Sequence, residues 1–294
     1  MTTGQTADPI NRPSKAAFEF VQALAQELSG GRIELPSFPD VAIRVQRALA
    51  DEDVRPDAIV RIIGAEPALA AWVLRMSNSA ALNVTGRQIT DLRTAVTRLG
   101  FNLVRSSAVS FAMSQLTRAE ELKGLEKPLR ELWDRSTLVA AMSNVVAKQF
   151  TQVNSDTALL AGLLHGIGRL YLLTRARKFP ALFTDTASYN QIVSDWHANV
   201  AKAILENWDL ADEIVAAVHE HEQVDRAHDG PADLTDVLLI GDLLASFREW
   251  PDSLELNLQG VQAVERMRLD RARLERVIEE SANEVAAMRQ ALGQ

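Results

Sequence analysis

Apolar residues recur at helical spacing along most of the chain, and no alternating apolar–polar run lasts more than a few residues. The ranges 59–63, 69–76, 138–146 and 214–218 each repeat apolar residues three or four positions apart, which places them on one face of a helix. Strand-forming alternation of Val, Thr and Tyr is absent. The pattern therefore predicts an all-α protein.

Proline and glycine divide this helical pattern into segments. An extended stretch ends at Asp40, which is predicted to be the N-cap of a helix over 41–50. Pro67 separates two short helices, and Gly100 marks a helix end. The predicted organisation is a flexible leader over 1–13, a main domain over 14–250 with a helical N-terminal subdomain (14–125) and a second helical block (129–250), and closing helices within 251–294.

Composition and net charge exclude several classes of protein. Apolar residues make up 47% of the chain and its net charge is −8, so electrostatics do not favour nucleic acid or anionic lipid as a partner. The absence of cysteine excludes disulfides, thiolate metal sites and a cysteine nucleophile. No run of about 18 apolar residues predicts a membrane span, and the N-terminus lacks a signal-peptide pattern. A cytoplasmic protein is predicted.

Charge is unevenly spread along the chain. The segment 206–242 holds 11 acidic residues and one basic residue, Arg226. Arginines gather instead within 87–105 and within 169–178. Solvated helix faces are the favoured interpretation of all three segments, with a docking surface as the alternative for the acidic one.

One apolar segment, 161–170, combines a histidine with three glycines. Gly162 and Gly166 lie four positions apart, so one face of this predicted helix allows close approach of another helix or of a ligand. Taken alone, His165 is most simply a buried core histidine. No two histidines of the chain have the i, i+4 spacing of a metal pair on one helix, so a metal site would need single ligands from several helices.

Several short motifs occur one after another along two blocks of the chain. The first block contains Leu35-Pro36-Ser37-Phe38-Pro39, then Glu66-Pro67, then Asn78-Ser79-Ala80, then Ala95 through Gly100; the second contains Trp133-Asp134-Arg135-Ser136, the segment ending at His165, Trp208 and the region of His221. Together they resemble the HDOD proteins, bacterial signalling domains related to the HD phosphohydrolases that generally lack the catalytic residues of those enzymes. The resemblance covers about residues 30–250. It implies a helical N-terminal subdomain packed on a degenerate HD-like core.

The resemblance also implies that the metal site of an HD phosphohydrolase is degenerate here. Such an enzyme uses an adjacent His-Asp pair; His165 matches the histidine, and Gly166 replaces the aspartate. Arg135 stands where another histidine is expected and cannot ligate a metal. It can pair with Asp242, or bind an anion in the vacated pocket. The remaining ligand positions are matched by His197, His221 and Asp242. Hydrolysis by metal-activated water needs more ligands, so no catalytic residue, metal or cofactor is predicted.

The leading hypothesis is a non-catalytic regulatory module that binds a protein partner in a bacterial signalling pathway, with a small anion or nucleotide in the degenerate pocket. One alternative is a residual metal-dependent phosphohydrolase acting on a nucleotide or cyclic dinucleotide. A second is a nucleic-acid-binding regulator that uses the arginines within 87–105 or 169–178. Asn78 and Ser79 are predicted to cap a helix or begin a turn rather than to bind a ligand.

Overall fold

The computed structural model describes residues 14–291, except 31–32, 34, 36–37, 52, 80–81, 84–85, 117, 248, 250–252 and 254–257. The described residues contain helices and no strand, which confirms the all-α prediction. The α-helices are α1 (Lys15–Ser29), α2 (Asp40–Ala50), α3 (Pro56–Gly64), α4 (Pro67–Ser77), α5 (Leu92–Leu116), α6 (Glu126–Phe150), α7 (Ser155–Leu164), α8 (Ile167–Ala176), α9 (Thr186–Asn207), α10 (Asp212–Glu220), α11 (Leu234–Phe247), α13 (Gln262–Met267) and α14 (Arg271–Ala291). Two short 3₁₀ helices lie at Glu120–Leu122 and Pro180–Phe183. The predicted leader, 1–13, lies outside the described residues.

Local sequence signals fix several helix ends. Pro67 occupies the first turn of α4, where its missing N–H costs nothing. The Asn154 side chain caps α7 by accepting two backbone N–H groups. Gly100 has a φ of 72° and breaks the helical path inside α5, as predicted. The prediction that Asp40 is the N-cap was wrong, because the helix starts directly after Pro39 and Asp40 is its first residue. The Asp40 side chain instead pairs with Arg44 at 3.0 Å.

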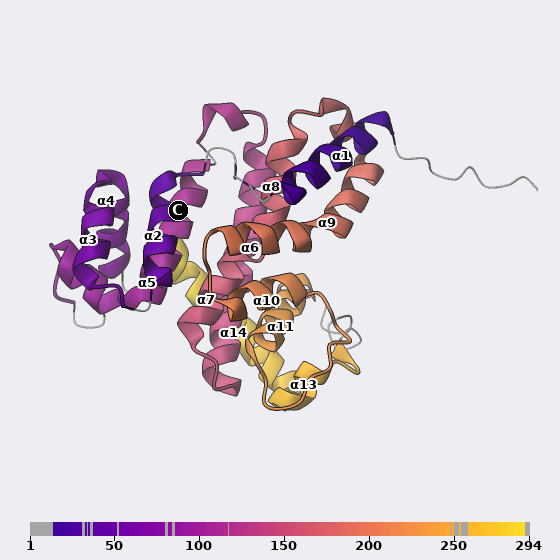
Figure 1. The fold of residues 1–294 in the computed structure, drawn as a ribbon. Helices are drawn as coiled ribbons and strands as arrows, with labels where there is room; N and C mark the ends of the chain where they lie inside the picture. Colours follow the sequence, from indigo (N-terminus) through magenta and orange to yellow (C-terminus); the bar gives the residue numbers. More distant parts are fainter. Residues whose placement is uncertain are drawn as a thin grey trace, which may run out of the picture.

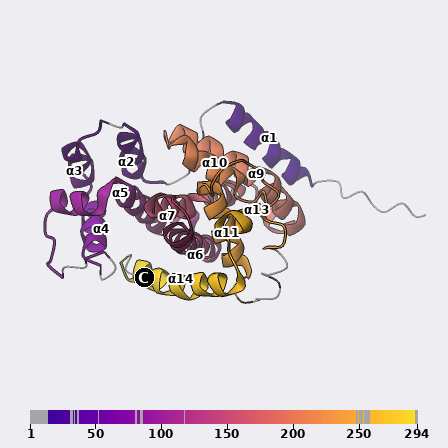
Figure 2. The ribbon, with the colours of Figure 1, turned by 90° about the horizontal axis from the view of Figure 1, so that it is seen from below.

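The helices form two groups, which meet where the long helix α5 packs on α7. Helices α2, α3 and α4 pack on α5, which in turn contacts α7 (Figure 1). The second group surrounds α6 and α7: α8 packs on α9, and α10 and α11 pack on one another and on α7. Helix α14 runs along α6, as the view from below shows (Figure 2). This second group carries the candidate site.

Helix α1 departs from the predicted organisation. It belongs to the N-terminal subdomain by sequence, but it lies across α9, away from α2–α4 (Figure 1). Phe20 packs edge-on against Phe179, with ring centroids 5.3 Å apart. Glu27 pairs with Arg175 and accepts a hydrogen bond from Tyr171, both on α8. Helix α1 therefore packs against the second group of helices.

Glycines allow the helices around the site to approach closely. A Cβ on Gly162 would lie 2.4 Å from Cα of Ala140, so α6 and α7 touch backbone to backbone. A Cβ on Gly168 would lie 1.9 Å from the carbonyl oxygen of His197, on α9. The stretch Ser155–Ala176 is long and apolar enough to cross a bilayer, which the sequence analysis did not predict. However, 89% of its most apolar window is buried inside the fold. Its apolar character is that of a core helix.

Candidate functional site

A cavity of about 380 Å³ opens between α6, the α7–α8 junction and α11. Each of these elements contributes a polar side chain from a distant part of the sequence. The cavity is lined by Leu132, Arg135, Ser136, His165, Gly166, Arg169, Glu222, Asp242 and Ser246. Four of the six residues predicted for the degenerate pocket are therefore brought together: Arg135, His165, Gly166 and Asp242.

The junction between α7 and α8 positions His165 and Gly166 at the cavity wall. The sequence predicted one continuous helix here, but α7 ends at Leu164 and α8 begins at Ile167. Gly166 is the N-cap residue of α8 and makes no side-chain cap. A Cβ at Gly166 would lie 3.0 Å from the Ser136 Oγ, so a larger residue at this position would press against the Ser136 side chain of α6.

The three predicted histidines are oriented in the same way. In each ring, Nδ1 lies close to a backbone carbonyl oxygen three or four residues earlier: 2.7 Å for His165, 2.8 Å for His197 and 2.8 Å for His221. Because a carbonyl only accepts, the proton is assigned to Nδ1. Burial lowers the pKa of His165 to about 4, and burial lowers the pKa of His221 as well. Both rings are therefore neutral near pH 7 and keep a lone pair on Nε2.

Arg135 and Asp242 form an ion pair across the cavity. The Nη2 of Arg135 lies 2.6 Å from Oδ1 of Asp242, and it also donates to the Asp242 carbonyl oxygen at 3.1 Å and to the Ser246 Oγ at 2.8 Å. Burial opposes ionisation of Asp242, but His165 and Arg135 outweigh it and hold the pKa of this carboxyl below its usual value. Of the two alternatives for Arg135, pairing with Asp242 is the one present in the structure.

A second ion pair, which the sequence analysis missed, joins α8 to the segment after α10. Arg169 Nη2 lies 2.6 Å from Oε1 of Glu222. The same carboxylate oxygen lies 3.2 Å from His197 Nε2 and 3.8 Å from His221 Nε2. His197 and Arg169, acting against the cost of burial, hold the pKa of Glu222 well below its usual range. His197 and His221 thus reach the cavity through Glu222 rather than lining it. The sequence did contain a signal for Arg169: it lies four residues after His165, and side chains four residues apart in a helical segment lie on the same face.

With this geometry in hand, comparison with known proteins identifies the family. The sequence model of the HDOD domain matches residues 35–224. The chain belongs to the HDOD family. An uncharacterized protein of Treponema pallidum is 24% identical over 223 residues, which span 69% of this chain and 40% of that protein. The aligned part is thus less than half of that relative.

Solved structures share the fold of this HDOD protein. A "putative metal-dependent phosphohydrolase" from Shewanella amazonensis has a TM-score of 0.72 and 25% identity, covering 95% of this chain and 100% of the other. An HDOD domain protein of unknown function from Geobacter sulfurreducens has a TM-score of 0.65 and 22% identity, covering 93% and 99%. The all-helical, HD-like architecture predicted from the sequence is therefore confirmed.

The HDOD cavity does not fit the metal centre that relatedness to phosphohydrolases implies. Gly166 offers no ligand atom, and the Arg135 guanidinium occupies the cavity wall with its positive charge against Asp242. Both carboxylates of the cavity are neutralised by an arginine, Arg135 or Arg169. A divalent cation would have to displace these guanidinium groups and tolerate their charge. The donor set of the described residues therefore argues against a metal in this cavity.

The HDOD motif residues of the first block hold a loop in place. Asn78 Nδ2 donates to the carbonyl oxygens of Leu74 and Ile89, both at 2.8 Å, and its Oδ1 accepts the Ile89 N–H at 2.8 Å. This links the end of α4 to the segment before α5, over a longer range than the predicted cap or turn. Glu66 is the extended residue before Pro67 at the start of α4, and Ser79 follows Asn78 in the same bend. Ala80 lies outside the described residues.

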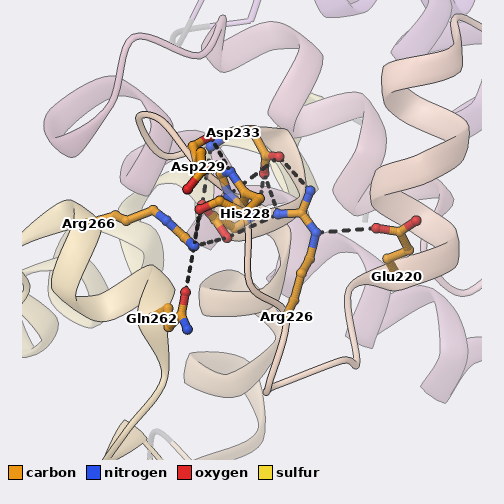
Figure 3. A network of polar contacts seen from close by, with 8 residues as sticks. Glu220, Arg226, His228, Asp229, Asp233, Gln262 and Arg266 are labelled. Atoms are coloured by element: carbon orange, nitrogen blue, oxygen red, sulfur yellow. Dashed lines mark hydrogen bonds and ion pairs between the residues drawn. The ribbon is translucent and has the colours of Figure 1, made fainter.

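Part of the acidic segment is buried rather than solvated. Asp236 is 1% exposed and pairs with Arg226 at 3.3 Å and Arg266 at 3.2 Å (Figure 3 shows these arginines). The Nε2 atom of His228 lies 2.9 Å from Oδ2 of Asp236. His228, Asp233 and Asp236 are the one group of three ligand-type side chains in the described residues whose donor atoms all lie within 4.8 Å of one another. Arg226 and Arg266 already balance the negative charge of this group. We therefore interpret the group as part of a structural ion-pair network that holds α13 against α11.

Proposed function

We propose that this HDOD domain is a non-catalytic regulatory module of bacterial signal transduction, which acts in the cytoplasm through contacts with a protein partner. The observation that carries the proposal is the Arg135–Asp242 ion pair, 2.6 Å long, in the cavity where a related phosphohydrolase would hold its metal. A domain that keeps the fold but lines this cavity with arginines retains surfaces for recognition and loses the means to activate water.

The charge arrangement supports the absence of hydrolysis. Metal-activated water requires several anionic or neutral ligands and one open coordination position. Here Arg135 and Arg169 each place a permanent positive charge beside a carboxylate that could otherwise ligate. Gly166 offers no carboxylate at the position where the aspartate of a phosphohydrolase is expected. Three separate positions of the cavity therefore oppose metal binding.

A metal-dependent phosphohydrolase acting on a nucleotide or cyclic dinucleotide is the second candidate. It is favoured by the three histidines, whose Nδ1 atoms are all held by backbone carbonyls in the way that metal-ligating histidines commonly are. The name of the Shewanella protein points the same way. This candidate predicts stoichiometric metal and hydrolysis that is lost in His165→Ala.

Metal content distinguishes the two candidates. The full chain, purified without chelator and also after incubation with manganese, is analysed by inductively coupled plasma mass spectrometry and assayed for hydrolysis of nucleotides and cyclic dinucleotides. We expect no stoichiometric metal and no activity. The matched control is the double variant Arg135→His with Gly166→Asp, which restores both lost ligand types and is expected to gain manganese. Stoichiometric metal in the unaltered protein would refute the proposal.

The regulatory part of the proposal requires a partner. The tagged chain is used as bait in a cell lysate, and candidate partners are then purified and tested for direct binding by isothermal titration calorimetry. A saturable one-to-one complex is the expected result. Failure of every captured candidate to bind the purified chain directly would count against action through protein contacts.

A further inference from the structure

The two guanidinium groups in the cavity have unused hydrogen-bond donors. All contacts of Arg135 with described residues run through Nη2, to Asp242 and Ser246. The ion pair of Arg169 with Glu222 also uses Nη2. The Nη1 and Nε groups of both side chains therefore have no hydrogen-bond partner among the described residues. Each side chain is about one-third exposed, at 33% and 34%, and lines the cavity.

Asp242 and Glu222 also line the cavity, each paired with an arginine, and beside them the cavity holds a buried neutral acceptor and a helix N-terminus without a carboxylate. His165 Nε2 has a lone pair, and among the described residues its near neighbour is another acceptor, Asp242 Oδ1 at 3.8 Å. Gly166 leaves the N-terminus of the ten-residue helix α8 without a carboxylate, so the partial positive charge of this helix end is not offset at that position. The hydroxyls of Ser136 and Ser246 lie in the same wall.

We infer that this cavity binds the phosphate group of a small phosphomonoester. The inference rests on the proposed function, because it requires the cavity to be free of metal. Phosphate oxygens match the planar N–H fork of arginine, and two guanidinium groups from different helices can grip one phosphate. A singly protonated phosphate also carries a P–OH group, which can donate to the His165 Nε2. Sulfate has no such hydrogen, so the site distinguishes the two anions.

The cavity volume favours a molecule larger than free phosphate. At about 380 Å³ it falls within the range of roughly 300–1,000 Å³ that is common for small-molecule sites. The positively charged groups lie on the walls contributed by α6 and α8, and Leu132 adds an apolar contact on the same side as Arg135. A phosphomonoester with a compact organic group fits this combination of anion donors and apolar surface.

Isothermal titration calorimetry of the full chain tests the inference. The probes are 5′-AMP, inorganic phosphate, sulfate and adenosine, used at about pH 6, where a phosphomonoester carries its P–OH group about half of the time. We expect one site for AMP, binding of sulfate at least about tenfold weaker, and no binding of adenosine. Tighter binding of AMP than of inorganic phosphate assigns the site to a phosphomonoester; equal binding would overturn that part of the inference in favour of free phosphate.

Variants locate the phosphate in the cavity. Arg169→Gln and Arg135→Gln are each expected to weaken AMP binding by roughly 10- to 100-fold, because each removes a charged donor. Gly166→Asp places a carboxylate at the N-terminus of α8 and is expected to abolish binding. Arg130→Gln, an exposed arginine on the same helix as Arg135, is the matched control and should leave the affinity unchanged. Circular dichroism verifies that each variant is folded.

The outcomes separate this inference from the proposed function. A metal-free, inactive protein that binds neither AMP nor inorganic phosphate overturns the phosphate site and leaves the non-catalytic module standing. Equal affinity for sulfate and phosphate also overturns it, because it would show attraction of any anion without recognition of the P–OH group. A protein that binds manganese in place of phosphate overturns both proposals.

Discussion

Replacing Arg135 by glutamine is expected to destabilise the protein in a way that depends on pH. The substitution keeps much of the side-chain length but removes the positive charge that faces Asp242. It also removes the donor that reaches Ser246 at 2.8 Å, so three hydrogen bonds between α6 and α11 are lost together. Asp242 would remain in a largely buried position, 17% exposed, without its arginine.

The expected loss of unfolding free energy is about 2 kcal/mol near neutral pH. Breaking a fully buried ion pair by removing one partner costs about 3–5 kcal/mol, whereas an exposed pair contributes about 0.2–1 kcal/mol. The Arg135–Asp242 pair lies between these limits, because its two side chains are 33% and 17% exposed. His165, at 3.8 Å, is neutral near pH 7 and does not replace the lost charge.

The pH dependence follows from the lowered pKa of Asp242. A carboxyl whose pKa is depressed in the folded state stabilises the fold above its unfolded pKa, and that contribution is lost as pH falls through the folded value. Arg135→Gln raises the folded pKa of Asp242, so the gap in stability between wild type and variant is largest near neutral pH. It should close as pH falls below about 4, where Asp242 is protonated in the unfolded chain and increasingly in both folded forms.

Urea denaturation followed by circular dichroism measures this effect at several pH values. Arg130→Gln serves as the control for loss of an arginine from the same helix. A double-mutant cycle with Asp242→Asn isolates the pair and should give a coupling energy of at least about 1 kcal/mol near neutral pH. Unchanged stability of Arg135→Gln, or a loss that is the same at all pH values, would refute the assigned role of the ion pair.

Three further predictions test other parts of the structure. Gly162→Ala should lower the unfolding free energy by about 2 kcal/mol in urea denaturation, since its Cβ would lie 2.4 Å from a backbone atom of α6. The control Gly64→Ala, whose Cβ would lie 3.7 Å from its nearest neighbour, should be neutral or slightly stabilising. Equal behaviour of the two variants would contradict the close packing of α6 and α7. In an NMR pH titration the imidazole of His165 should stay neutral down to about pH 5, because its pKa is about 4, and a midpoint above pH 6 would contradict its burial. Arg266→Gln, which leaves the buried Asp236 with one arginine fewer, should speed amide hydrogen exchange in 262–291, and unchanged protection there would show that the network does not hold α13.

The parts of the fold that depend on local sequence could be predicted. Helical periodicity gave the all-α class, and Pro67 and Gly100 marked helix boundaries that the structure contains. Asp40 shows the limit of this reasoning. It is a favoured N-cap residue, but the preceding Pro39 already has the extended backbone of an N-cap, so the helix begins one residue earlier than predicted.

The site could be predicted only in part, because its contacts join distant segments. Arg135 and Asp242 are separated by 107 positions, and pairing with Asp242 was one of two open alternatives. The Arg169–Glu222 pair depends on how α8 packs relative to the segment after α10, which periodicity does not specify. The burial of Asp236 was missed for the same reason, since Arg266 lies 30 positions away.

In the metal-free module proposed above, the two ion pairs of the cavity would take over the structural role of a metal. A metal bound by side chains of several helices ties those helices together, so its binding energy contributes to folding. In this protein Arg135 joins α6 to α11, and Arg169 joins α8 to the segment after α10. The two arginines thus tie together the walls of the cavity while they repel a divalent cation from it. Both arginines line the cavity. Under the two proposals, the side chains that would replace a metal as a structural link are therefore also those that would bind a phosphate.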